Sequence, residues 1–281
     1  MFRARTRSGL LMASRRPRLS RDDLRALFIE TGRAILREEG LGAGGEALTF
    51  KRVSDRVEAG TGIRVTNASL IGRVWENQFE YQTDVLATIA ADDSTSEIEQ
   101  TMQDMAPILL NMDPTSEESR RWTMREVCRA SAAANTIALS RSTDWSLWIG
   151  IWAVTAVGAV PERRRRIESA LEQSYQAMTE RMERIYRAGI DFVGYRVRSG
   201  LTVRQFTIAN AALAEGCVLR NRVDAAHMDG ILRPTGPNGE EQEWTLFGLA
   251  LEALSQAFFE LDPDWVPTSV DATSVSGVVN A

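Results

Sequence analysis

The chain has 281 residues, of which 44% are hydrophobic and 25% charged, a balance typical of a globular protein with a sizeable core. Its two cysteines and single histidine imply no zinc site and no disulfide framework, and no run of about 18 uncharged apolar residues is present to span a membrane. The basic N-terminus lacks the continuous apolar core of a secretory signal, and Met12 is an alternative start. We therefore expect a cytoplasmic protein with no metal, no cofactor and no membrane partner.

The net charge of −5 is divided unevenly along the chain. Residues 1–80 hold 14 Arg and 1 Lys against 10 Asp and Glu, a net +5, whereas residues 81–281 hold 18 Arg against 28 Asp and Glu, a net −10. A basic end joined to an acidic body indicates an end that faces a polyanion. The alternative is that the surplus belongs to a terminal arm alone, because seven of these arginines lie within the first 21 residues.

Three helices of about 17, 10 and 9 residues are predicted between residues 20 and 80. Ser20, Thr49 and Asn77 have the residue type that caps a helix N-terminus, and the first two precede apolar residues at helical spacing. A glycine-rich connection separates the first two helices, and a glycine-containing turn separates the second from the third.

The remainder of the chain is predicted to be almost entirely helical, with hardly any strand-type alternation. Helices are expected at residues 94–112, 115–140, 141–157, 161–192, 202–222 and 243–260. We therefore expect an all-α fold with a three-helix domain at residues 20–80 and a larger helical bundle at 81–265. The basic arm at 1–19 and the Ser, Thr and Val-rich tail at 266–281 are predicted to be disordered.

The order of the first three helices matches a helix-turn-helix unit, whose recognition helix presents its N-terminal residues to base edges in the major groove. In the segment VTNASLIGRVWENQFE (65–80), small polar residues stand where the third helix starts and permit close approach to DNA. The alternative is that these residues only cap a helix and that the arginine after them is solvated. The predicted DNA contacts are Lys51, Arg52, Thr66, Asn67, Ala68, Ser69 and Arg73.

At these residues the chain resembles the TetR family of transcriptional regulators, and the resemblance extends over residues 20–265. LTFKRVS (48–54) is similar to the family's second helix, and TNASLIGRVWENQFEYQTDVL (66–86) to its third helix and the start of its fourth. Trp75 stands at the place of the family's phenylalanine, and Asn77 at that of the serine that caps the fourth helix.

The chain departs from the family pattern in three ways. Its turn before the third helix is longer, Trp75 falls one residue later than the family's phenylalanine, and Ile71 and Gln78 replace the tyrosine and lysine that commonly contact phosphate. Arg64, Arg73 or the basic arm must then supply these contacts, which adds Arg64 to the predicted DNA-binding residues. Asn77, at the cap of the fourth helix, is also among them.

The resemblance implies a homodimer in which the last two long helices of each subunit form the interface. The alternative is that their apolar stripes pack inside a single chain. The predicted interface residues are Phe206, Ala209, Leu213, Cys217, Phe247, Leu251, Leu254 and Phe258.

The resemblance also implies a pocket in the acidic body for a small apolar or aromatic effector, although an aromatic stripe can equally belong to the core. The predicted lining residues are Trp122, Trp145, Trp148, Trp152 and Met178. The implied function is a ligand-responsive regulator, most simply a repressor, acting on a pseudopalindromic operator in double-stranded DNA. The alternative is an all-α small-molecule-binding or interaction protein of the same architecture that has lost specific DNA recognition.

An enzymatic function is not expected. The one histidine, His227, lies in a polar stretch, which leaves no basis for a histidine-based triad or metal cluster. GLGAGG (40–45) spells G-x-G-x-x-G, but it follows a helix and not a strand, so the context of a dinucleotide site is absent.

Overall fold

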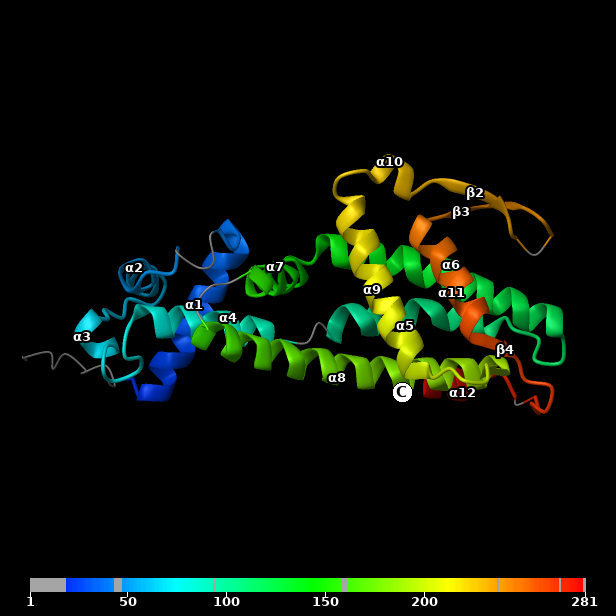
Figure 1. Cartoon of the computed structure of the whole chain (residues 1–281), viewed down its shortest axis with the longest axis horizontal. Helices are drawn as coiled ribbons and strands as arrows, with labels where there is room; N and C mark the ends of the chain where they lie inside the picture. Colours follow the sequence, from blue (N-terminus) through cyan, green and yellow to red (C-terminus); the bar gives the residue numbers. More distant parts are fainter. Residues whose placement is uncertain are drawn as a thin grey trace, which may run out of the picture.

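A computed structural model of the chain describes residues 19–42, 47–92, 95–157, 161–236, 238–267 and 269–279 (Figure 1). These residues are mostly helical, which confirms the all-α prediction at the level of fold class. The basic arm expected at residues 1–19 lies outside these ranges except for Leu19, and so does the part of the glycine-rich connection at 43–46.

The helices follow the predicted order, and most boundaries fall within a few residues of the predicted ones. Their bounds are α1 (Arg21–Glu39), α2 (Phe50–Thr61), α3 (Asn67–Leu70), α4 (Gln78–Ala90), α5 (Thr95–Leu110), α6 (Glu117–Arg141), α7 (Thr143–Val157), α8 (Pro161–Val193), α9 (Val203–Asn221), α10 (Ala225–Met228), α11 (Leu246–Phe258) and α12 (Ala272–Val279). Two antiparallel strand pairs join them: β1 (Tyr195–Val197) with β4 (Phe259–Leu261), and β2 (Ile231–Pro234) with β3 (Glu241–Trp244).

The three predicted N-terminal caps are confirmed. Side-chain oxygens of Ser20, Thr49 and Asn77 accept hydrogen bonds from backbone N–H groups in the first turn of α1, α2 and α4, at 3.0, 3.2 and 2.9 Å. Such bonds satisfy N–H groups that have no partner inside the helix, and each stabilises a helix by about 1 kcal/mol.

A first hydrophobic core holds α1–α4 together around four aromatic rings, those of Phe28, Phe50, Trp75 and Tyr81. The Trp75 and Tyr81 rings meet edge-on with centroids 4.8 Å apart. Residues of α7 and α8 complete this core, namely Leu147, Ile151, Ile167 and Leu171. The packing therefore continues across the domain boundary expected at residue 80.

Two further cores lie beyond the first. The second unites α6, α8, α9 and α11 with β1 and β4, and the third unites α5, α8 and α12. Figure 1 shows α8 running along the long direction of the molecule, with α1–α4 gathered at one end and α6, α9 and α11 at the other. None of the helices in the described part of the chain has the length and apolar content needed to cross a membrane.

The prediction of disorder across residues 266–281 is wrong for α12. Its Val275 and Val278, three positions apart, are buried in the third core against Met112 and Val193. The Asp271 carboxylate starts the helix by accepting backbone N–H bonds from the first turn at 2.9 and 2.8 Å. The Ser and Thr content of this tail favours disorder, but its valines form a short apolar stripe that packs in the third core.

Candidate functional site

The third helix of the helix-turn-helix candidate is shorter than the sequence predicts. α3 covers only Asn67–Leu70, and Gly72 then adopts a φ of +73°, a left-handed conformation that favours glycine. The Gly72 N–H donates to the Trp75 carbonyl at 2.8 Å, which closes a turn in place of further helix. Leu70, Val74 and Trp75 are buried, whereas Ile71 is 49% exposed, and the predicted helix length is wrong.

The start of α3 forms a small polar surface. Thr66, Asn67 and Ala68 are exposed, and Ser69 is half-buried beside them. The Ser69 hydroxyl donates to the Thr66 carbonyl at 2.6 Å and accepts from the Thr66 N–H at 3.1 Å. The structure thus brings all four predicted residues together at one surface turn, where Asn67 is exposed.

Two of the predicted DNA contacts, Lys51 and Arg52, form ion pairs within the protein. Lys51 donates to the Asp55 carboxylate at 2.7 Å, one turn along α2. Arg52 is ion-paired with Glu39 at the end of α1. Both cations are exposed, so phosphate can reach them only in competition with these carboxylates.

The other two predicted arginines differ from each other. Arg73 is half-buried and donates to the Leu19 carbonyl at 3.1 Å, so it holds the chain that enters α1. Arg64 is exposed, and no ion pair is found for it among the described residues. Arg64 is therefore the most available cation beside α3.

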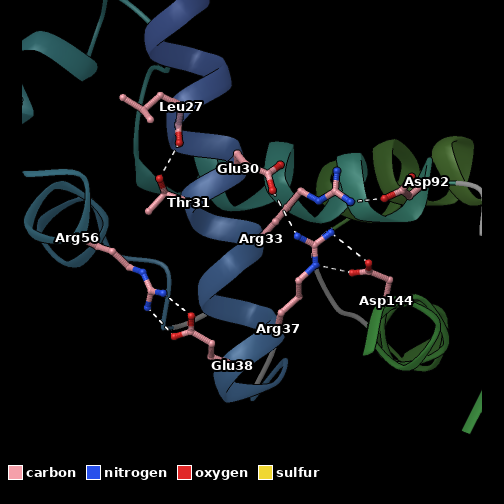
Figure 2. Close-up of polar contacts among 9 residues, drawn as sticks. All are labelled: Leu27, Glu30, Thr31, Arg33, Arg37, Glu38, Arg56, Asp92 and Asp144. Atoms are coloured by element: carbon pink, nitrogen blue, oxygen red, sulfur yellow. Dashed lines mark hydrogen bonds and ion pairs between the residues drawn. The ribbon is translucent and has the colours of Figure 1, made fainter. Parts of the chain in front are cut away.

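The described part of the N-terminal unit carries no net charge. Residues 19–80 without 43–46 hold 8 Arg and 1 Lys against 9 Asp and Glu, which gives zero. Arg56, for example, is held through two nitrogens by the Glu38 carboxylate (Figure 2). The basic surplus read from the sequence therefore comes from the six arginines of residues 1–18.

One departure from the family pattern has a structural role. Gln78 stands where the family has lysine, and its side-chain oxygen accepts from the Phe50 N–H at 3.1 Å. Beside it, Asn77 caps α4. Gln78 therefore connects α4 to α2, whereas Asn77 is exposed and its side-chain oxygen is engaged in the cap.

A cavity of about 140 Å³ lies among α6, α7, α8 and α9. Three of the predicted lining residues, Trp145, Trp148 and Met178, border it. The other two do not: Trp122 is half-buried elsewhere on α6, and the Trp152 side chain is 46% exposed on the outer side of α7. The helical spacing of Trp145, Trp148 and Trp152 predicts that all three face one site. The cavity borders only the first two, because it does not extend along α7 as far as Trp152.

The polar lining of this cavity, which α9 supplies, is not among the residues predicted from the sequence. Asn210 is buried, its amide N–H donates to the Tyr186 hydroxyl at 2.6 Å, and its Oδ1 has no partner among the described residues. Glu215 lies five residues further along α9, and burial raises the pKa of its carboxyl to about 7. Polar residues inside an otherwise apolar helix are the signal that could have indicated them.

Two ion pairs tie α1 to the edge of the cavity. Asp92, which borders the cavity, is paired with Arg33 of α1. Asp144, the neighbour of the lining residue Trp145, accepts two bonds from Arg37 at 2.7 and 3.1 Å. Figure 2 shows both arginines reaching from α1 to these carboxylates. The helix that supports the N-terminal unit therefore also contacts the wall of the cavity.

A buried carboxylate makes a second connection, between α1, α4 and the first turns of α8. Asp84 of α4 accepts from Trp75 Nε1 at 3.0 Å and pairs with Arg25 of α1 at 2.7 Å. Arg166 of α8 pairs with the same carboxylate. The turn after α3 is thus connected through one side chain to α8, the helix that borders the cavity.

The predicted dimer residues belong largely to the core of the chain itself. Phe206, Phe247 and Leu251 are buried in the second core, so their side chains cannot meet a second copy, and the other five predicted residues are half-buried. Each of α9 and α11 has more than one apolar face, and the predicted interface residues lie on the face that packs inside the chain. The outer faces of α9 and α11 expose Ile208, Ala212, Gly216, Leu219, Leu246, Ala253 and Ala257.

Across the described ranges, no group of three or more His, Cys, Asp or Glu side chains is placed to hold a metal ion. Comparison with known proteins adds no assignment, because no family model, no curated protein and no solved structure matches the chain.

Proposed function

We propose that the chain is a ligand-responsive transcriptional regulator of the TetR type, which binds a pseudopalindromic operator in double-stranded DNA as a homodimer. The observation that carries this proposal is the double role of α1. α1 packs with α2 and α4 in the first core, and its Arg33 and Arg37 pair with carboxylates at the edge of the cavity. The unit proposed to read DNA (α1–α4, the reading unit) and the ligand site share α1, so a change at one can affect the other.

The coupling follows from these contacts. A ligand that enters the cavity meets Asp92 and Trp145, which lie at the end of α4 and the start of α7. A shift of either residue moves the carboxylates that hold Arg33 and Arg37, and α1 moves with them. The ligand then favours one spacing of the two reading units in the dimer, and operator affinity changes accordingly.

The outer faces of α9 and α11 are the proposed dimer interface. They expose Ile208, Leu219 and Leu246 together with small residues that allow helices to approach closely. An apolar surface of this kind is typical of a homodimer interface.

A second candidate, a small-molecule-binding protein without specific DNA recognition, is favoured by the zero net charge of the described N-terminal unit. In that case the six arginines of residues 1–18 attract DNA without reading its sequence.

A gel-shift titration of the full chain separates the two candidates. We expect tighter binding to DNA upstream of its own gene than to a scrambled duplex of equal length, at fixed salt near the physiological value. Equal and weak binding to both duplexes would overturn the regulator and favour the second candidate.

Arg64→Ala tests whether the α3 surface takes part. It should weaken operator binding and reduce the salt dependence by about one phosphate contact. Arg184→Ala is the matched control, since Arg184 is an exposed arginine of α8 that donates to the Glu180 carbonyl, and it should leave affinity unchanged.

A further inference from the structure

The cavity among α6, α7, α8 and α9 has the size of one small ring. Its volume of about 140 Å³ is close to that of an engineered apolar cavity of about 150 Å³ that binds benzene. Trp145 and Trp148 of α7 and Met178 and Met182 of α8 supply large apolar surfaces to its wall. A ligand here therefore needs a compact aromatic or aliphatic body.

Two hydrogen-bond acceptors on α9 distinguish this cavity from a purely apolar one. Asn210 is only 6% exposed, and its Oδ1 lacks a partner in the described structure. A buried carbonyl oxygen without a donor is unfavourable by about 1–3 kcal/mol, so a ligand that brings an N–H or O–H group there binds more tightly.

Glu215 is the second acceptor, and it brings negative charge. It borders the cavity, and no ion pair is found for it in the described ranges. Burial raises the pKa of its carboxyl to about 7. The other charged groups of the lining are Asp92, which is paired with Arg33, and Arg181. With both carboxylates ionised, the described lining carries a net charge of −1.

Building on the ligand-responsive function proposed above, we propose that this cavity binds a small protonated amine that carries a single aromatic ring. The ammonium group pairs with the Glu215 carboxylate, the Asn210 carbonyl oxygen offers a second acceptor, and the ring lies against Trp145 and Trp148. Aromatic faces attract cations as well as rings, so the tryptophans favour both parts of such a ligand.

Calorimetric titration of the full chain with four probes of similar size tests the class of ligand. The probes are benzylamine, benzyl alcohol, toluene and benzoate, all titrated at pH 8. Benzylamine should bind most tightly. Binding of toluene or benzoate as tight as that of benzylamine would overturn the proposal, and so would the absence of binding by every probe.

Glu215→Gln tests the residue. The variant should lose roughly tenfold to a hundredfold in affinity for benzylamine, the range expected for a hydrogen bond to a charged group, and nothing for toluene. Glu172→Gln, an exposed glutamate of α8 outside the lining, is the control and should bind as the unaltered chain does. Equal affinity of both variants for benzylamine would remove Glu215 from the site.

The pH dependence of the unaltered chain gives a second readout that needs no variant. Benzylamine stays protonated between pH 6 and pH 8, whereas Glu215 ionises in this window, so affinity should rise with pH. The titratable groups that border the same cavity are Asp92, Tyr175, Arg181 and Tyr186. A flat profile would contradict the ion pair. None of these titrations contains DNA, so failure of the amine inference is distinguishable from failure of the gel shift.

Discussion

Trp75 Nε1 donates to Asp84 Oδ2 at 3.0 Å, and both side chains are buried. The bond connects the turn after α3 to α4, and Arg25 and Arg166 bring α1 and α8 to the same carboxylate. A buried charge is tolerated only when it is paired and hydrogen-bonded, so the carboxylate and its three donors act as one unit. The orientation of α3 depends on this unit.

Replacing Asp84 with Asn should therefore lower the free energy of unfolding by about 2–4 kcal/mol, because both ion pairs are lost while the shape is kept. Urea denaturation followed by circular dichroism measures this change. Asp55→Asn is the control, since Asp55 is an exposed carboxylate paired with Lys51, and it should leave the midpoint unchanged. Equal midpoints for the two variants would show that the buried carboxylate contributes no more than a surface pair.

Gly32 allows α1 to approach α4 closely. A Cβ atom at this position would lie 2.5 Å from the Tyr81 hydroxyl, which donates to the Phe28 carbonyl at 3.0 Å. Gly32→Ala should therefore destabilise the protein by about 1–3 kcal/mol, although alanine favours helices more than glycine does.

Two comparisons make this prediction specific. Tyr81→Phe removes the clashing oxygen, so the double variant Gly32→Ala with Tyr81→Phe should be more stable than Gly32→Ala alone. Gly189→Ala, in α8 with nothing within 4 Å, should stabilise the protein by up to about 1 kcal/mol. If Gly32→Ala has the same effect as Gly189→Ala, the close approach is not tight. Thermal unfolding of the variants measures each difference.

The local features of this fold could be predicted from the sequence, whereas the long-range ones could not. Ser20, Thr49 and Asn77 bond to backbone groups within three residues, so their residue type and neighbours suffice. The end of α3 depends on Gly72 adopting a positive φ, which no apolar spacing reveals.

The candidate sites show the same limit. Arg52 is a predicted phosphate contact, but Glu39, 13 residues away, holds it. Phe206 is a predicted interface residue, but its ring packs at 4.6 Å between centroids against Phe259 of β4. Which carboxylate or ring faces a side chain follows from tertiary packing, and periodicity reports only that one face of a helix is buried.

Val275 tests whether the tail contributes to the fold. This side chain is 2% exposed in the third core, so Val275→Ala should lower the free energy of unfolding by about 1–2 kcal/mol. Val223→Ala is the control, because Val223 is 84% exposed and its truncation should change nothing measurable. Identical urea midpoints for the two variants would mean that α12 does not pack stably in solution.

Glu215 should make stability depend on pH. Burial raises the pKa of its carboxyl from an ordinary 4.5 to about 7, so the unfolded chain ionises it first as pH rises. This group therefore lowers stability progressively between about pH 4.5 and pH 7, and the full penalty persists above that range.

Glu215→Gln removes the penalty and should be more stable than the unaltered chain at pH 8, by about 1–2 kcal/mol after allowance for partial exposure. The two proteins should converge near pH 4.5. Guanidinium denaturation at both pH values measures the difference, and a constant offset between them would contradict a raised pKa.

The 33 residues of α8 form a rod about 50 Å long at 1.5 Å per residue. Ile167 packs in the first core, Ile190 in the second and Phe192 in the third. Loss of this single helix would expose all three cores at once, so their stabilities are coupled through α8. The chain should consequently unfold in one cooperative transition, with the N-terminal unit and the bundle sharing a single melting temperature.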